Sequence, residues 1–301
     1  MGASSFVQDF RLWYYSKPPA LRSLIAVNVV LYVLWQFLRF SDTIALFFYQ
    51  YLTLHPQLPD ILWHPWQFVT YSFLHLGTGL SGFLHILFNM LWLYWMGYDY
   101  ERLYGSHRLL ALYVLAAIGG GVLTVVLHTL FPGVPNFGGP VYGASASVIG
   151  VLVAQATLHP RRGIGLLFIG VVPLKWLAIG FLVLDALLGF GSNVSLSAHW
   201  GGALVGYWFV QLERKGVDLS SWAQWFMGRP SRRRISVMAR LEHMLSRKEQ
   251  STSGTSLTAS NMQGEDIDER EIDRILDKIS AYGYDALTEE EKEKLYRASS
   301  R

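Results

Sequence analysis

Two short segments of this sequence could form a hydrolytic site. Ser145 lies in a run of small residues, 141–147, and His199 lies in a second run, 197–202; apolar stretches surround both. Polar side chains are costly in hydrocarbon and usually have a function and a partner there. A serine hydroxyl becomes a nucleophile when a neighbouring base takes its proton, and a neutral histidine is such a base. The two residues therefore predict a nucleophile and its base.

Two further polar residues could assist this chemistry. His85 and Asn89 are four residues apart, which places them on one face of a helix. Both side chains can donate hydrogen bonds, and donors aimed at a developing oxyanion lower the barrier to acyl transfer. Ser145 is itself expected near the start of a helix, where free N–H groups and the helix dipole favour negative charge. The sequence thus offers a nucleophile, a base and oxyanion donors.

Composition indicates the class of protein that must position these residues. Of 301 residues, 51% are hydrophobic and 16% are charged, and the mean hydropathy is +0.26. Several long apolar runs of this kind are typical of a polytopic membrane protein. The absence of cysteine excludes disulfides, thiol catalysis and thiolate metal sites. A net charge of +3 gives no indication of nucleic-acid binding.

The predicted fold is all-α, with six helices that cross the membrane. The expected spans lie at about residues 24–38, 83–98, 109–130, 141–158, 174–190 and 198–212, and residues 164–173 are expected at the interface. Small residues mark where spans can approach closely: Gly119 to Gly121 in the third, Gly143 and Ser147 in the fourth, and Gly202 and Gly206 in the sixth. The last two pairs predict a tight contact between the fourth and sixth spans, beside Ser145 and His199.

Basic residues orient these spans. Lysine and arginine occur before the first span, in alternate connections and after the sixth span, whereas none occurs between Arg39 and Arg102. By the positive-inside rule both termini are cytoplasmic. The second, fourth and sixth spans then enter from the outer face, so that His85, Asn89, Ser145 and His199 lie at one depth. Each alone has a structural explanation, as a hydrogen bond within or between helices, and the functional interpretation depends on this common depth.

The connection between the first two spans is aromatic rather than hydrophilic. Residues 41–82 contain three prolines and many Phe, Tyr and Trp residues, a pattern that favours a segment lying in the membrane interface. We expect His64 and His75 in this connection to be exposed and to have no role in the site.

Four segments divide the chain. Residues 1–20 form a cytoplasmic N-terminus without a cleavable-signal pattern, and residues 21–215 form the six-span domain. Residues 216–264 combine an interfacial basic and aromatic segment with a flexible linker rich in Ser, Thr and Gly. Residues 265–301 are expected to form a small cytoplasmic helical hairpin, in which Thr288 and Glu291 fit a capping box.

Three motifs resemble those of the rhomboid intramembrane serine proteases. They are His85-Ile86-Leu87-Phe88-Asn89 followed by Gly97, Glu101-Arg102 and Gly105-Ser106; Gly143-Ala144-Ser145-Ala146; and Ala198-His199-Trp200-Gly201-Gly202. The resemblance covers residues 20–215, and the C-terminal hairpin resembles a short domain appended to some bacterial rhomboids. Departures from the family pattern are Ala146, where many members have glycine, Ile149, where an aromatic residue is often found, and Gln67, where some members have arginine.

The resemblance implies an intramembrane serine endopeptidase with the rhomboid six-helix core. Ser145 would be the nucleophile, His199 the general base, and Asn89 and His85 the oxyanion donors. The substrates would be single-span membrane proteins, cleaved in or beside their transmembrane segment without metal or ATP. The topology fits a bacterial inner membrane, and an organelle membrane stays open.

Two other classes of function are alternatives. A rhomboid-like pseudoprotease would bind and route membrane clients, but such a protein is expected to lack the nucleophile or the base, and both are present here. A small transporter would need charged residues along a path through the spans, and Asp185 and Lys175 alone make no convincing ion path.

Overall fold

The structure is a computed structural model that describes residues 14–134, 137, 139–166, 170–189, 195–227, 288, 290 and 291. The chain divides into two compact units, Met1–Arg240 and Leu241–Arg301. In the second unit the predicted capping box is formed: the Thr288 N–H donates to Glu291 Oε2 at 2.7 Å, and the Glu291 N–H donates to Thr288 Oγ1 at 3.3 Å. The rest of the predicted hairpin, and the linker before it, lie outside the described residues.

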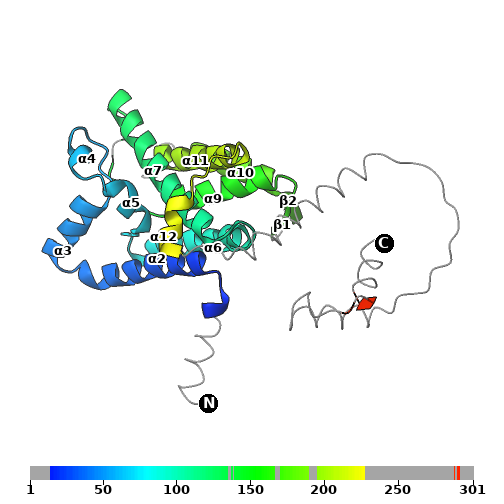
Figure 1. Cartoon of the computed structure of the whole chain (residues 1–301). Helices are drawn as coiled ribbons and strands as arrows, with labels where there is room; N and C mark the ends of the chain where they lie inside the picture. Colours follow the sequence, from blue (N-terminus) through cyan, green and yellow to red (C-terminus); the bar gives the residue numbers. More distant parts are fainter. Residues whose placement is uncertain are drawn as a thin grey trace, which may run out of the picture. The chain divides into compact units, whose positions relative to one another are not determined.

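Six helices of 14 residues or more make up most of the described part of the first unit (Figure 1). They are α2 Pro19–Leu38, α6 Gly79–Tyr104, α7 Ser106–Leu130, α9 Ser145–Leu158, α10 Leu174–Gly189 and α11 Leu196–Arg214. Each overlaps one predicted span. Among the described residues, α2 and α7 are long and apolar enough to cross a membrane by length and composition, and α9 is a shorter apolar helix.

Three helix starts differ from the prediction by four residues or more. The first helix, α2, begins at Pro19 instead of at about residue 24. The fourth helix begins at Ser145 rather than at residue 141, because Gly143 has φ +124°, which a right-handed helix does not accommodate. The second begins at Gly79, four residues earlier than expected, so Asn89 lies in its third turn rather than its second.

Helices α7, α9 and α11 meet along a line of glycines that we call the glycine seam: Gly119, Gly120, Gly150, Gly201, Gly202 and Gly206. A Cβ atom at Gly202 would lie 2.1 Å from the Ala146 carbonyl oxygen, and one at Gly206 would lie 2.2 Å from that of Gly150. On the other side of α11, a Cβ at Gly201 would lie 2.4 Å from the Gly119 carbonyl oxygen. The helix backbones are therefore in direct contact, as small residues at helix crossings allow.

The partner of α11 on the fourth helix differs from the prediction. The seam uses Ala146 and Gly150, not Gly143 and Ser147. Gly143 precedes the helix, and Ser147 faces α7, where its hydroxyl donates to the Tyr113 carbonyl oxygen at 2.8 Å. Ala146 and Gly150 are four residues apart and therefore share the face of α9 that α11 covers. Ser147 is one residue after Ala146 and so lies on a different face.

A buried carboxylate holds the first helix in place. Glu101, near the end of α6, accepts hydrogen bonds from the backbone N–H groups of Ala20 at 2.8 Å and Leu21 at 2.6 Å. It also accepts one from the Ser106 hydroxyl at 2.6 Å. The first N–H groups of a helix lack partners within the helix, and a carboxylate there also complements the helix dipole. Glu101 thereby fixes the start of α2 against the turn between α6 and α7.

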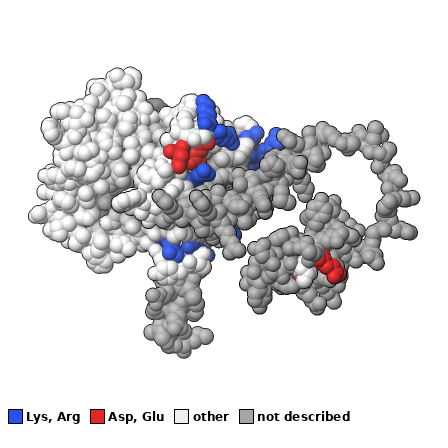
Figure 2. All heavy atoms as spheres, in the orientation of Figure 1, with Lys and Arg blue, Asp and Glu red and all other residues white. Residues whose placement is uncertain are grey.

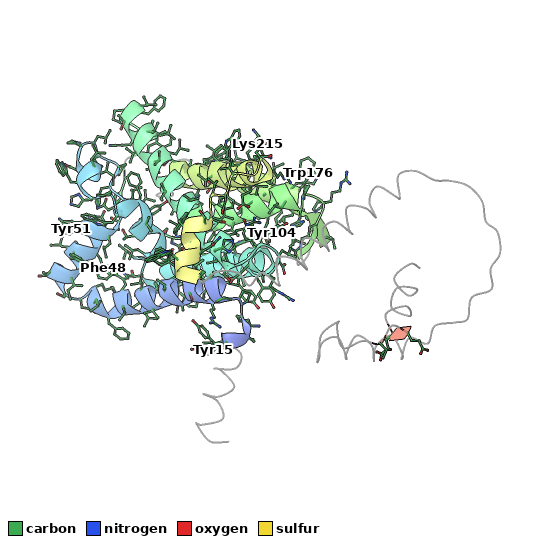
Figure 3. The ribbon with its side chains drawn as sticks, in the orientation of Figure 1. Tyr15, Phe48, Tyr51, Tyr104, Trp176 and Lys215 are labelled. Atoms are coloured by element: carbon green, nitrogen blue, oxygen red, sulfur yellow. The ribbon has the colours of Figure 1, made fainter. Side chains whose placement is uncertain are left out.

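The aromatic connection is built from short helical pieces. These are α3 Asp42–Phe47, the π-helical turn η1 Phe48–Leu52, α4 Asp60–Trp63, α5 Gln67–Thr70 and the 3-10 turn η2 Tyr71–Phe73. Phe48 and Tyr51 lie on the opposite side of the molecule from Tyr104 and Trp176 (Figure 3). Trp63 is 76% exposed, which suits a segment that contacts lipid rather than the protein core.

Side-chain amides and indoles anchor this connection to itself. The Gln67 amide donates to the Gln50 carbonyl oxygen at 2.9 Å and accepts from the His55 N–H at 3.1 Å. The Trp66 indole donates to the Tyr51 carbonyl oxygen at 2.8 Å. Gln67, which departs from the family pattern, thus makes two hydrogen bonds that fix the fold of the connection.

One part of the fold is not helical. Strands β1 Gly163–Leu166 and β2 Gly170–Pro173 pair antiparallel between α9 and α10, with Ile164 opposite Val172. The prediction of an entirely α-helical protein is therefore wrong for residues 163–166 and 170–173, which lie outside the helices. The β-branched residues Ile164, Val171 and Val172 favour a strand over a helix here.

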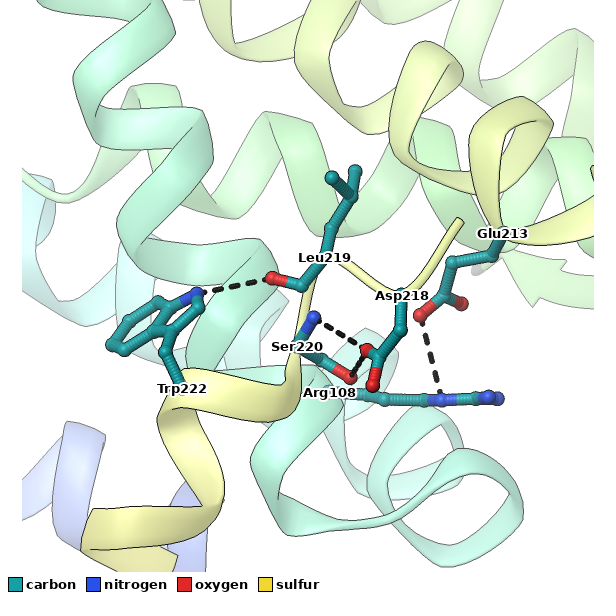
Figure 4. Close-up of polar contacts among 6 residues, drawn as sticks. All are labelled: Arg108, Glu213, Asp218, Leu219, Ser220 and Trp222. Carbon is teal, nitrogen blue, oxygen red and sulfur yellow. Dashed lines mark hydrogen bonds and ion pairs between the residues drawn. The ribbon is translucent and has the colours of Figure 1, made fainter. Parts of the chain in front are cut away.

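The chain after α11 turns back onto α7. The turn η3 Ser221–Ala223 and helix α12 Gln224–Met227 both contact α7. Figure 4 shows the contacts at this turn: Arg108 Nε lies 3.4 Å from Glu213 Oε1, and the Asp218 carboxylate accepts from the Ser220 N–H and hydroxyl, each at 2.8 Å. The Ser220 N–H contributes most to lowering the pKa of Asp218.

Lys and Arg side chains are unevenly distributed over the first unit. Over α3 and α4 the face in Figure 2 is almost entirely white and shows no Lys or Arg, although each of these helices begins with an exposed aspartate, Asp42 and Asp60. Elsewhere in this unit, Arg162 pairs with Asp99. The expected orientation, with an outer end free of Lys and Arg and a cytoplasmic end that carries them, stays a prediction.

Candidate functional site

Ser145 and His199 are in hydrogen-bond contact. His199 Nε2 lies 2.8 Å from Ser145 Oγ, although the residues are 54 positions apart in the sequence. Ser145 is the first residue of α9, and His199 lies in the first turn of α11. The glycine seam brings the backbones of α9 and α11 together beside this contact, since Ala146 and Gly202 follow Ser145 by one residue and His199 by three.

A third residue completes a chain of hydrogen bonds. Asp185 on α10 places its Oδ1 atom 2.7 Å from His199 Nδ1. The two side chains are 9% and 12% exposed, so bulk water screens this contact little. A carboxylate can only accept a hydrogen bond, so the Nδ1 atom carries the hydrogen, and the Nε2 atom is free to accept the hydroxyl hydrogen of Ser145.

The sequence interpretation considered Asp185 only as part of an ion path. A signal for its role was nevertheless present, because an acidic residue in an apolar span is costly and is expected to have a partner. The sequence alone does not show toward which neighbouring helix Asp185 faces.

His85 borders the same small space as the serine hydroxyl. A Cβ atom built on Gly143 would lie 3.3 Å from His85 Nε2 and 3.9 Å from Ser145 Oγ. Asn89 lies one turn further along α6 and is 8% exposed; its amide donates to the His85 carbonyl oxygen at 2.9 Å.

His75 lies inside the protein, which corrects the expectation of an exposed residue. It is 1% exposed, and its Nε2 atom accepts a long hydrogen bond of 3.5 Å from the N–H of Ala144. Its ring packs edge-on to that of His85, with 5.3 Å between ring centroids. His64 is half-buried beside Trp66 rather than exposed. The end of the aromatic connection therefore forms one wall of the site.

Backbone contacts fix the approach to α9. The Gly143 N–H donates to the Tyr71 carbonyl oxygen at 3.0 Å, and Leu54 and Val141 exchange a pair of backbone hydrogen bonds at 3.0 and 2.9 Å. The Tyr71 hydroxyl in turn donates to the Ala117 carbonyl oxygen on α7 at 2.8 Å. Ser145 therefore sits at a rigid helix start, where the first N–H groups have no acceptor within the helix.

This arrangement has the parts needed for acyl transfer. A hydroxyl, an imidazole with an oriented lone pair and a carboxylate form one chain of hydrogen bonds. A helix N-terminus and His85 lie beside the hydroxyl, where an oxyanion would develop. Four helices, α6, α9, α10 and α11, contribute these groups.

Comparison with family models gives one match in the central part of the chain and one in its C-terminal part. A family model described as Rhomboid domain matches residues 62–215, and a family of unknown function, DUF6576, matches residues 265–301.

Two curated rhomboid proteins are similar to about three fifths of the chain. RHOMBOID-like protein 12, mitochondrial, of Arabidopsis thaliana is 30% identical over 200 residues, which are 60% of this chain and 54% of that protein. Rhomboid protease GlpG of Photorhabdus laumondii is 27% identical over 189 residues, 62% of this chain and 59% of GlpG. The chain spans about half the length of the curated relatives it matches.

Proposed function

Because the chain belongs to the rhomboid family, we propose that it is an intramembrane serine endopeptidase that hydrolyses peptide bonds in or next to transmembrane segments. The observation that carries this proposal is the 2.8 Å contact between Ser145 Oγ and His199 Nε2. A serine and a histidine at this distance, beside a helix N-terminus, supply the nucleophile, the base and an oxyanion site.

The proposed reaction has two steps. As Ser145 Oγ attacks the carbonyl carbon of the scissile bond, its proton moves to His199 Nε2, and the oxyanion accepts hydrogen bonds from the Ser145 N–H, His85 and Asn89. The C–N bond then breaks, the leaving amine takes the proton from Nε2, and an acyl ester stays on Ser145. In the second step Nε2 takes a proton from water, the hydroxide attacks the ester, and Nε2 returns the proton to Oγ.

We also propose the setting of this reaction. All six long helices cross the membrane, both termini are cytoplasmic, and the site lies below the outer face of a bacterial inner membrane. The substrates are single-span membrane proteins. The absence of Lys and Arg over α3 and α4 in Figure 2 supports this orientation, as does the absence of lysine and arginine between Arg39 and Arg102 in the sequence.

Cleavage of a reporter in liposomes tests the proposal. The purified protein, reconstituted with a single-span reporter, is expected to release a fragment and to react covalently with a fluorophosphonate. His199→Ala should lower both rates by about 10³-fold, because the serine loses its base. His128→Ala, which removes a half-buried histidine from the far part of α7, is the matched control and should retain both rates.

Two outcomes would contradict parts of this proposal. Equal cleavage by wild type and His199→Ala would remove the base from the mechanism. A folded wild-type protein that binds the reporter but neither cuts it nor reacts with the fluorophosphonate would favour the pseudoprotease alternative.

The oxyanion donors give a separate prediction. His85→Ala and Asn89→Ala should each lower kcat by about 10²-fold, since each removes a donor to charge that develops only in the transition state. KM should change little. Asn28→Ala is a suitable control, because the Asn28 amide donates to the Leu24 carbonyl oxygen as that of Asn89 does to His85, but far from the site. A kcat loss in Asn28→Ala as large as in Asn89→Ala would mean that both asparagines act on folding alone.

A further inference from the structure

We infer that Asp185 is the positioning residue of the base, so that the site works as a three-residue chain in which α10 supplies the carboxylate. This inference rests on the proposed function of Ser145 and His199. It adds a residue that the hydrolytic motifs in the sequence do not contain.

The geometry fixes the imidazole ring at both nitrogen atoms. Nδ1 lies 2.7 Å from Asp185 Oδ1, and Nε2 lies 2.8 Å from Ser145 Oγ. Because the carboxylate only accepts, the ring must hold its hydrogen at Nδ1, and this is the tautomer whose Nε2 can take a proton. Asp185 therefore determines both the tautomer and the rotation of the ring.

The charges change in a way that this contact favours. When the Ser145 proton arrives at Nε2, the ring becomes a cation that still donates its Nδ1 hydrogen to Asp185. That hydrogen stays on Nδ1, and the carboxylate stays ionised throughout. Both side chains are close to nine-tenths covered by protein, so the attraction between carboxylate and imidazolium is screened little by water.

Asp185 lacks the contacts of a purely structural carboxylate. Its second oxygen, Oδ2, is buried and has no hydrogen-bond partner within the described part of the chain. By contrast, the structural carboxylate of Glu101 accepts three hydrogen bonds. A buried charge with a single bond costs stability, and this cost is typical of a group retained for function rather than for folding.

The base and the residue that orients it lie on different helices. His199 belongs to α11, which packs tightly on α7 and α9 through the glycine seam, whereas Asp185 belongs to α10, which packs chiefly on α9 and less on α11. A shift of α10 would remove the carboxylate from the ring without moving the serine or the histidine.

Three substitutions test the inference in the reporter assay. In Asp185→Asn the amide can donate to Nδ1, which favours the tautomer whose Nε2 carries hydrogen and cannot act as a base. We expect kcat to fall about 10²-fold with KM within about twofold of wild type. Asp185→Glu keeps a carboxylate and should recover part of this loss. Asp99→Asn removes the exposed carboxylate that pairs with Arg162 and should leave kcat unchanged.

A second measurement reports the tautomer directly and does not need a cleaved substrate. In protein labelled with ¹⁵N-histidine, the His199 signals, assigned by their loss in His199→Ala, should show hydrogen at Nδ1 in wild type and a shift toward hydrogen at Nε2 in Asp185→Asn. A merely structural residue would not move this tautomer.

The outcomes separate this inference from the proposed function. If Ser145→Ala is inactive but Asp185→Asn keeps the wild-type kcat and tautomer, Asp185 has no positioning role and the protease proposal stands. If Asp185→Asn loses activity only in proportion to its folded fraction, with an unchanged tautomer, the residue is structural and the inference is wrong. If Ser145→Ala cuts as well as wild type, the protease proposal itself fails, while the tautomer still decides whether Asp185 orients His199.

Discussion

Ser145→Ala is expected to lower the rate of reporter cleavage by about 10⁴-fold or more, because no other group can form the acyl ester. The fluorophosphonate should no longer label the protein. The variant should fold and insert as the wild type does, since the hydroxyl makes one hydrogen bond, to His199, at the open end of α9. Cleavage of a single-span reporter in liposomes, with thermal unfolding measured on the same preparation, checks both parts.

Ser147 provides the matched control for this variant. It lies two residues further along α9 and is fully buried, and its hydroxyl donates to Tyr113 of α7. Ser147→Ala should lower stability by about 1 kcal/mol, the usual contribution of such a bond, and keep the nucleophile. If Ser145→Ala retained wild-type cleavage, or if Ser147→Ala lost labelling while folded, Ser145 would not be the nucleophile.

Gly202→Ala is expected to lower both stability and activity. The new Cβ atom would lie 2.1 Å from the Ala146 carbonyl oxygen, a backbone atom that cannot turn aside as a side chain can. Helix α11 must therefore move away from α9, at a cost of roughly 1–3 kcal/mol in the free energy of unfolding. The same movement separates His199 from Ser145, and a displacement of about 1 Å can lower a rate by about 10²-fold.

Gly180→Ala controls for the change in side chain. Gly180 lies in α10, and a Cβ atom there would meet nothing within 4 Å. Since alanine favours a helix over glycine by roughly 0.5–1 kcal/mol, this variant should be as stable as wild type or more so. Denaturant unfolding of both variants measures the difference, and equal stability and kcat for Gly202→Ala and wild type would show that the seam does not determine the distance between α9 and α11.

Much of the fold follows from patterns that act along the chain. Apolar runs broken by basic connections locate all six long helices, because burial and hydrogen bonding in hydrocarbon leave a helix as the usual solution. The pairing of Ser145 with His199 follows from the depth of each residue in its span, and GxxxG in the sixth span indicates the face that meets another helix. Predicting these features needs only the spacing of residues along the chain and the direction in which the spans cross the membrane.

Other features depend on the rotation of each helix about its own axis. Asp185 sits in the fifth span, but its position alone does not say whether it faces lipid, α9 or His199. Whether Ala146 and Gly150 or Gly143 and Ser147 contact α11 depends on the residue at which α9 begins. The positive φ of Gly143 delays that start to Ser145. His75 is enclosed because the aromatic connection folds inward at Tyr71, whose hydroxyl reaches α7. The composition of that connection does not predict this inward fold.

The weak packing of α10 has a consequence for how the site responds to heat. Local opening costs least where few buried contacts must be given up, and α10 exposes much of its apolar surface, with Leu187 at 70% and Trp176 at 57%. Local opening of α9 or α11 would instead break backbone contacts along the whole glycine seam. As temperature rises, we therefore expect α10 to fray before the seam helices α9 and α11, so that the histidine loses its carboxylate while the nucleophile is still in place. Activity would fade over a range in which the rest of the fold is intact, and it would return on cooling.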